Sequence, residues 1–155
     1  MLISRKSAKT ATIAALALAE MCVTGEAASE TYIIANSREQ AKIAFNFCSH
    51  YARGLDPRKK HFKVYRDYII YPKLDSKIKV LSSDTMSADG YSPSMAIIDE
   101  YHAATTNDAV EVMKSGMAAR KSPLTCIISS AGFLLDGYPC YELYKLGKRV
   151  LKGEI

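Results

Sequence analysis

The stretch of sequence that decides the fold is Ser4-Arg5-Lys6-Ser7-Ala8-Lys9-Thr10. It is polar and basic, and it follows three residues, Met1 to Ile3, that have the character of the end of an apolar strand. From Thr10 to Met21 the chain contains strong helix formers and neither glycine nor proline, which predicts a helix. The stretch is therefore expected to be a loop that leads from a strand into a helix.

A loop in this position is the setting of a phosphate-binding P-loop. The N-terminus of the helix would present free backbone N–H groups and its positive dipole end to phosphate oxygens. In this interpretation Lys9 reaches the β- and γ-phosphates of a nucleotide, and the Thr10 hydroxyl binds Mg²⁺. The usual pattern, G-x-x-x-x-G-K-[ST], has two glycines, and Ile3 and Ala8 occupy their places here. Alanine resists φ angles that glycine tolerates, so Ala8 is expected to restrict the loop. The segment alone is also compatible with a basic helix start whose lysines are merely solvated.

A second segment, Met95-Ala96-Ile97-Ile98-Asp99-Glu100, is an apolar strand that ends in two carboxylates. This order is typical of a Walker B motif, in which Asp99 would hold Mg²⁺ directly or through water and Glu100 would orient the attacking water. Ligands of open α/β sheets bind at this end of the strands. The alternative is an ordinary charged strand end. His102 follows closely, and it would sense the γ-phosphate, contact a neighbouring subunit, or simply pack or cap.

The rest of the chain alternates short apolar strands with helices. Strands are predicted at 31–35, 63–71, 77–81, 95–98 and 124–129, and further helices at 38–53, 107–117 and 138–151. Ser37 and Gln40 have the spacing of a capping box at the start of the second helix. Short all-apolar strands between helices indicate a largely parallel sheet covered on both faces. The predicted fold class is α/β, a P-loop NTPase-type three-layer sandwich.

Length and composition set outer limits on these predictions. The 155 residues are enough for one domain, and the net charge of +5 is compatible with nucleic acid without proving it. The basic start of the chain and the run from Ala11 to Ala19 have the outline of a signal peptide. That run is only weakly hydrophobic and continues amphipathically to Val23, which favours a folded helix. No stretch approaches the roughly 20 apolar residues that a membrane span needs.

The four cysteines are widely spaced, which argues against a zinc site. They are Cys22, Cys48, Cys126 and Cys140. We interpret them as reduced thiols of a cytosolic protein that lie mostly in the core.

Taken together, the segments resemble the large terminase subunits of tailed phages, from Ser4 to about Phe133. The loop resembles that family's deviant Walker A motif, which carries an arginine and normally lacks the first glycine, although the family usually keeps glycine at the position of Ala8. Three further segments carry the resemblance: Tyr32 to Ala35 with Arg38 to Lys42, Leu81 to Asp84 leading through Gly90 to His102, and Thr125 to Gly132. The last reads Thr-Cys-Ile-Ile-Ser-Ser-Ala-Gly and matches the coupling motif, where the family often has Thr-Thr-Ala-Gly.

The resemblance implies ATP hydrolysis with Mg²⁺ in a viral DNA-packaging motor. The residues that it implies for binding the nucleotide are Arg5, Lys6, Ser7, Ala8, Lys9, Thr10, Ser129 and Ser130. It further implies Thr10 and Asp99 as metal ligands and Glu100 as the catalytic carboxylate. Arg5 would stabilise transition-state charge on the γ-phosphate. Ser129 and Ser130 would sense the γ-phosphate and pass its loss to DNA-gripping elements, unless they form a plain strand-to-loop turn.

The resemblance also implies partners and missing parts. The partners are double-stranded DNA, the portal protein, the small terminase subunit and further copies in a ring, in the cytoplasm of the host bacterium. The family carries an upstream adenine-binding segment and a C-terminal nuclease domain. Only Met1 to Ile3 precede the loop, and the acids after Gly132 are too few for a nuclease, so residues 1–155 are expected to be a partial terminase ATPase domain. The alternatives are another P-loop ATPase of helicase type and an inactive prophage-derived remnant.

One basic stretch is a candidate for contacts with DNA. Its basic residues are Arg53, Arg58, Lys59, Lys60, His61, Lys63 and Arg66, and Tyr51, Phe62 and Tyr65 lie between them. Such residues would grip phosphates. The alternative is a solvated loop beside an edge strand, whose lysines would prevent it from pairing with a strand of another chain.

Overall fold

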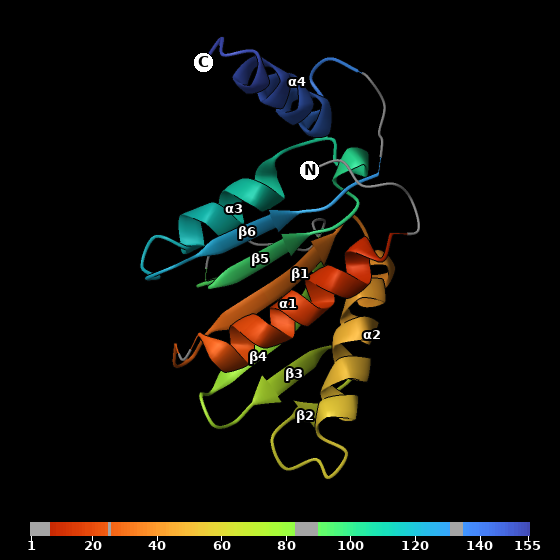
Figure 1. The fold of residues 1–155 in the computed structure, drawn as a ribbon, viewed down its shortest axis with the longest axis vertical. Coiled ribbons are helices and arrows are strands. Elements are labelled where there is room, and N and C mark those ends of the chain that lie inside the picture. Colours follow the sequence, from red (N-terminus) through yellow and green to blue (C-terminus); the bar gives the residue numbers. More distant parts are fainter. Residues whose placement is uncertain (1–6, 25, 83–89, 131–134) are drawn as a thin grey trace.

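The computed structural model describes residues 7–24, 26–82, 90–130 and 135–155 (Figure 1). Its helices are α1 (Lys9–Val23), α2 (Arg38–Leu55), the 3-10 helix η2 (Tyr101–Ala103), α3 (Asp108–Gly116) and α4 (Pro139–Leu151). Its strands are β1 (Glu30–Ala35), β2 (Lys63–Val64), β3 (Tyr68–Tyr71), β4 (Ser76–Ser82), β5 (Met95–Ile98) and β6 (Leu124–Ile127). Each predicted helix is present, with ends that differ from the prediction by two residues at most.

The strands form one sheet in the order β2-β3-β4-β1-β5-β6. The four strands β4, β1, β5 and β6 run parallel, and β2 and β3 add an antiparallel edge. This confirms the predicted, largely parallel sheet. In the register, Ile34 pairs with both Leu81 and Ile98, and Ile98 pairs with Ile127. The residues that follow these four strands therefore emerge together at one edge of the sheet, which we call the carboxyl edge.

Helices cover both faces of the sheet, as the three-layer prediction requires. On one face α1 and α2 lie side by side (Figure 1), packed against Ile33 of β1 and Ile97 of β5. On the other face α3 packs against Ile34 and Ile98, the neighbours of those residues in sequence. Because successive side chains of a strand point to opposite faces, the all-apolar strands supply both cores at once. The strand β6 is the exception, since it is half-buried and Leu124 is 38% exposed.

Helix α1 is an integral part of the core. Its buried residues include Ala14, Ala17 and Leu18. The small alanines let α2 approach closely enough for the buried Cys48 thiol to donate a hydrogen bond to the Ala14 carbonyl at 3.6 Å. The run from Ala11 to Ala19, which gave the outline of a signal peptide, is therefore part of a packed helix. None of the described helices is long and apolar enough to cross a membrane.

The prediction of a single strand at 63–71 was wrong. The structure divides this segment into β2 and β3, which pair as a tight hairpin. The turn contains Asp67, whose carboxylate forms ion pairs with Arg38 at 3.1 Å and Lys42 at 3.0 Å, both on α2. Tyr65 and Tyr68 stack with their ring centroids 4.4 Å apart. The turn is thus held by contacts with α2 and across the hairpin, and the segment contains no glycine or proline that would mark it.

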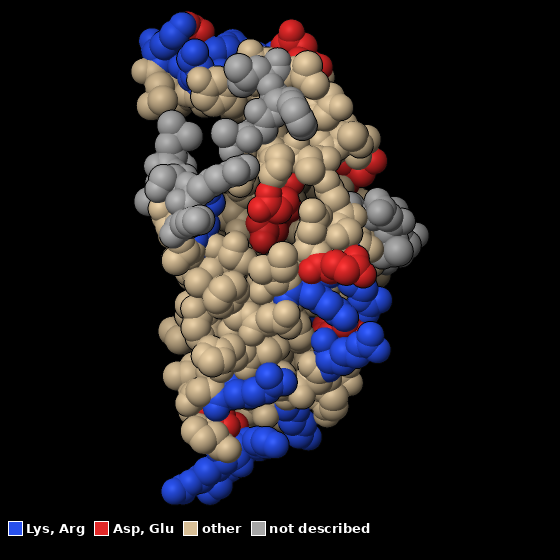
Figure 2. Space-filling model, turned by 90° about the vertical axis from the view of Figure 1, so that its right-hand side faces the viewer, with Lys and Arg blue, Asp and Glu red and all other residues tan. Residues whose placement is uncertain are grey.

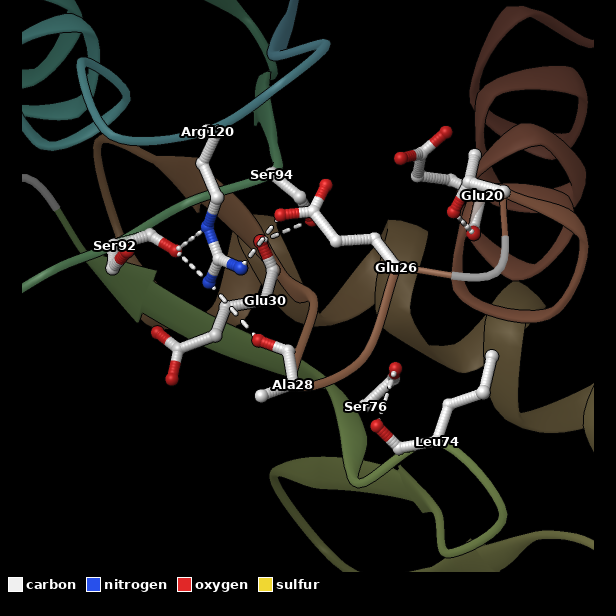
Figure 3. A network of polar contacts seen from close by, with 10 residues as sticks. Glu20, Glu26, Ala28, Glu30, Leu74, Ser76, Ser92, Ser94 and Arg120 are labelled. Carbon is white, nitrogen blue, oxygen red and sulfur yellow. Dashed lines mark hydrogen bonds and ion pairs between the residues drawn. The ribbon is translucent and has the colours of Figure 1, made fainter.

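Arg120 cross-links the opposite edge of the sheet, the amino edge (Figure 3). It precedes β6, and its guanidinium donates to the Ser92 carbonyl at 2.9 Å, the Ala28 carbonyl at 3.0 Å and the Glu26 carboxylate at 3.0 Å. The side chain is only 11% exposed. These bonds join the segments that lead into β1, β5 and β6. We call this set of contacts the Arg120 clamp.

Candidate nucleotide-binding site

Asp99 lies at the carboxyl edge, where β5 ends. Its backbone N–H donates to the Ile34 carbonyl at 2.8 Å, which extends the pairing of β5 with β1. The residue is 7% exposed, and burial raises the pKa of its carboxyl group. The Glu100 N–H donates to Asp99 Oδ1 at 2.8 Å and acts against that rise, whereas the Glu100 charge adds to it. The positive charges of His102 and, less strongly, of Lys9 also act to lower the pKa of Asp99.

The start of α1 differs from the start of α2. Helix α2 has the predicted capping box, in which Ser37 Oγ accepts from the Gln40 N–H at 3.2 Å and the Gln40 side chain accepts from the Ser37 N–H at 3.3 Å. The residue at the N-cap of α1 is Ala8, whose side chain has no polar atom with which to cap the helix. The first N–H groups of a helix need acceptors. Among the described residues, α1 thus begins without the side-chain cap that α2 has.

Ala8 adopts left-handed backbone angles, with φ 53° and ψ 26°. This is the region that glycine enters freely and alanine enters at a cost of about 1–2 kcal/mol. The loop therefore requires at this position the conformation that P-loops obtain from glycine. The expectation that alanine is restrictive here has a geometric basis in the structure.

Glu100 also has left-handed backbone angles, with φ 53° and ψ 41°, and it begins the short helix η2. The turn brings His102 back beside it, so that His102 Nδ1 lies 3.1 Å from Glu100 Oε2. Strained backbone of this kind is concentrated at functional sites. The two acidic residues thus point to different surroundings, Asp99 into the sheet edge and Glu100 towards His102.

Ser129 follows β6 and comes next to the turn after β5. Its hydroxyl oxygen accepts from the His102 N–H at 2.9 Å, and its hydrogen is donated to the Ser130 carbonyl at 2.9 Å. The thiol of Cys140, in the first turn of α4, lies 3.7 Å from the same hydroxyl. The predicted coupling segment is therefore in direct contact with the turn that carries Glu100.

The remaining predicted residues are distributed around this edge. Thr10 and Ser130 are half-buried, and Ser7 is exposed. Arg5 and Lys6 lie outside the residues that the structure describes, as do Ala131 and Gly132 of the coupling motif. The structure thus brings Lys9, Asp99, Glu100 and Ser129 to one edge, and it leaves the role of Arg5 as an expectation.

A cavity of about 380 Å³ opens beside Asp99, between the ends of β1 and β5 and the start of α3. Among the polar residues that line it are Asn36, Thr105 and Asp108. The sequence interpretation missed these residues. Asn36 directly follows β1 at the carboxyl edge, so the rule that ligands bind there would have identified it. Thr105 and Asp108 lie in a loop and a helix start without a recognisable pattern.

Comparison with known proteins supports the resemblance to the large terminase subunits of phages. The model of the family described as terminase large subunit, ATPase domain, matches residues 1–149. The large terminase subunit of Enterobacteria phage HK97 is 31% identical over 135 residues, which are 83% of this chain and 26% of that protein. Protein YmfN of Escherichia coli strain K12 is 39% identical over 67 residues, 43% of this chain and 14% of that protein. The chain thus spans about a quarter of the length of the HK97 subunit.

Solved structures share the fold. The HK97 large terminase has a TM-score of 0.79 at 24% identity, over 99% of this chain and 32% of that one. A large terminase from a thermophilic bacteriophage, solved in complex with ADP, has a TM-score of 0.66 at 14% identity, over 94% of this chain and 37% of that one. With a family model that matches residues 1–149, the chain belongs to the family of terminase large subunit ATPase domains.

Proposed function

We propose that this chain binds ATP with Mg²⁺ and hydrolyses it as the ATPase unit of a phage DNA-packaging motor. The observation that carries the proposal is that two elements far apart in sequence, the start of α1 and the end of β5 with the buried Asp99, both come to the carboxyl edge (Figure 1). The family membership supports it, and a related terminase was solved with ADP. In the whole motor, double-stranded DNA, the portal protein, the small subunit and further copies in a ring would be the partners, in the cytoplasm of the host.

The residues fit the chemistry of phosphoryl transfer. The first N–H groups of α1 and the ammonium group of Lys9 would bind the phosphates, together with Arg5, Lys6 and Ser7. Thr10 and Asp99 would hold Mg²⁺, which supplies positive charge to the β- and γ-phosphate oxygens and retains several water ligands. A buried carboxylate whose pKa is raised suits this role, because a cation would offset the cost of its burial. Glu100 would orient the attacking water, and Ser129 and Ser130 would contact the γ-phosphate.

The test of nucleotide binding is a titration of ATP–Mg²⁺ that follows the melting temperature. A ligand present at about 100 times its Kd stabilises the folded state by about 2.7 kcal/mol. The Lys9→Ala variant should lose this rise, and the matched control Lys152→Ala, on an exposed side chain beyond the last turn of α4, should keep it. Glu100→Gln should still bind ATP and lose phosphate release. The absence of any rise at millimolar nucleotide would identify the chain as an inert remnant.

We further propose that the basic stretch contacts the DNA backbone. Its exposed cations include Arg58, Lys59 and Lys60, in the loop that follows α2. Figure 2 shows lysines and arginines towards the end of the molecule where β2 and β3 lie, and a second group at the opposite end, over α4.

The side chain of Asp56 holds the backbone of this loop by hydrogen bonds. It is 6% exposed and accepts hydrogen bonds from the backbone N–H groups of Lys60, His61 and Phe62, at 3.0, 2.6 and 2.9 Å. Although burial acts in the opposite direction, these three donors lower the pKa of Asp56. The loop is therefore ordered, and its cations project from a fixed backbone.

The salt dependence of duplex binding tests this surface. Each phosphate contact contributes about 0.9 to the slope of log K against log salt concentration. Replacement of both Lys59 and Lys60 by alanine should lower the slope by about 1.8. The control pair, Lys148→Ala with Lys152→Ala on the opposite end of the molecule, should leave it unchanged. Equal losses in the two variants would show that binding follows net charge and not this loop.

A further inference from the structure

We propose that His102 is a positioning residue that holds the Glu100 carboxylate and connects it to Ser129 at the end of the neighbouring strand. The catalytic meaning of this connection rests on the proposed ATPase function. The connection itself rests on the contacts of three side chains, and it is testable without turnover.

A single nitrogen atom makes the connection. His102 Nδ1 lies 3.1 Å from Glu100 Oε2 and 3.3 Å from Ser129 Oγ. The backbone N–H of His102 also donates to Ser129 Oγ, at 2.9 Å. The imidazole is largely enclosed, with 23% of its side-chain surface exposed. His102 therefore touches the end of β5 and the end of β6 at the same time.

The placement of hydrogens decides which tautomer the imidazole adopts. The hydroxyl of Ser129 has one hydrogen, and its geometry directs it to the Ser130 carbonyl at 2.9 Å. An ionised Glu100 carboxylate only accepts hydrogen bonds. With the Ser129 hydrogen donated to Ser130, Nδ1 of His102 lies between two acceptors, which favours the proton on Nδ1. Neutral imidazole has one N–H, so Nε2 is left as the bare nitrogen.

This arrangement favours a positioning role over the other roles of His102. Nδ1 is already engaged by Glu100 and Ser129, so this nitrogen is not available to bind a γ-phosphate. Mere packing would not require contact with a carboxylate and a hydroxyl from two different strands. Because Glu100 and Ser129 share one donor, a displacement of Ser129 changes the hydrogen bond that orients Glu100. The orientation of the carboxylate is thereby linked to the position of the coupling segment.

The tautomer can be measured directly by ¹⁵N NMR of histidine-labelled protein near pH 8, where imidazole is neutral. The sequence has three histidines, and the other two, His50 and His61, are exposed and serve as internal references. We expect His102 in the Nδ1–H form and the references mainly in the Nε2–H form. Glu100→Ala should move His102 towards the reference pattern, and Ser129→Ala should do so less, because the Glu100 carboxylate still accepts from Nδ1 in that variant. An Nε2–H signal for His102 in the unmodified chain, or no response to either variant, overturns the proposal.

Turnover supplies a second readout. His102→Asn keeps an N–H donor near the position of Nδ1, whereas His102→Leu removes the donor and retains bulk. We expect kcat to fall by about tenfold or more in the leucine variant and by clearly less in the asparagine variant, because misplacement of a catalytic group has effects of this size. The rise in melting temperature with ATP should persist in both. Equal kcat values in the two variants contradict the proposal. A chain that shows the expected tautomer but no turnover contradicts the ATPase function and retains the connection.

Discussion

The two edges of the sheet are built in opposite ways, although the same four parallel strands run between them. At the amino edge the Arg120 clamp pairs a nearly buried cation with a carboxylate and two carbonyls. At the carboxyl edge Ala8 and Glu100 have strained left-handed backbone, and Asp99 is buried with a raised pKa. Left-handed backbone is not confined to the carboxyl edge, since Ala28 at the amino edge has a φ of 55°. The edges differ in their buried charges, because the Arg120 cation is paired with a carboxylate, whereas the Asp99 carboxyl group has a raised pKa where phosphate chemistry is proposed.

The largest expected effect comes from removal of the clamp. Arg120→Ala leaves the Glu26 carboxylate and the Ser92 and Ala28 carbonyls without their donor. The loss of a buried charged partner costs several kcal/mol, so we expect a loss of about 3 kcal/mol in the free energy of unfolding, measured by urea denaturation. Arg149→Ala is the control, since that side chain is 55% exposed and lies in a surface pair with Glu154. A loss of less than about 0.5 kcal/mol for Arg120→Ala would contradict the clamp.

A second substitution at the amino edge, Gly116→Ala, would introduce a steric clash. A Cβ atom at Gly116 would overlap the Tyr91 carbonyl oxygen and lie 2.9 Å from Pro93 Cδ. Because backbone must move to make room, Gly116→Ala should cost about 2 kcal/mol. Gly147 of α4 has nothing within 4 Å of its would-be Cβ. Gly147→Ala should therefore stabilise the chain by about 0.5–1 kcal/mol, and two losses of equal size would contradict the distinction.

At the carboxyl edge the expected effect has the opposite sign. Ala8→Gly relieves the left-handed strain at the start of α1 and should stabilise the chain by about 1 kcal/mol. The matched control is Ala28→Gly, because Ala28 has a similar φ of 55° at the amino edge. Both variants should melt at higher temperature, and only Ala8→Gly should also tighten ATP binding. A similar change in ATP affinity for both would contradict the link between Ala8 and the site.

The smallest expected effect concerns the buried carboxylate. Because burial raises the pKa of Asp99, the folded chain holds that proton more tightly than the unfolded chain. The contribution of Asp99 to the free energy of unfolding therefore falls as the pH rises from the ordinary pKa of about 3.9 to the raised value. At neutral pH the ionised, buried carboxylate still destabilises the folded chain. Without metal, Asp99→Asn should raise the melting temperature by about 2 °C at neutral pH.

The pH profile supplies the check on Asp99. The advantage of the asparagine variant should shrink as pH falls through the same window. The control Asp136→Asn changes a side chain that is 86% exposed, and it should show little change. A lower melting temperature for Asp99→Asn at neutral pH would contradict the assigned cost of burial.

Much of the fold was accessible from the sequence because the local signals agree with the tertiary structure. All-apolar strands between helices predicted the parallel sheet, and Ser37 with Gln40 predicted the start of α2. The hairpin at 63–71 was missed because it depends on ion pairs between Asp67 and α2, which no local pattern records. The clamp was missed for the same reason, since Arg120 and Glu26 are separated by 94 residues.

The candidate site was predictable to a similar extent. The rule for carboxyl ends of parallel strands predicted that Asp99 and Glu100 lie at this edge, the P-loop pattern pointed to Lys9, and the family resemblance added Ser129. These signals did not reveal that His102 lies between Glu100 and Ser129, because this contact depends on the 3-10 turn η2. Side-chain connections across adjacent strand ends follow from backbone geometry, and a single sequence does not contain that geometry.

The separation of 94 residues between Arg120 and Glu26 has a consequence for synthesis of the chain. A ribosome adds roughly 5–20 residues per second, so several seconds pass between the emergence of the two partners. In that interval α1, α2 and the strands up to β5 are already available to assemble. The clamp can therefore close only after these elements have emerged.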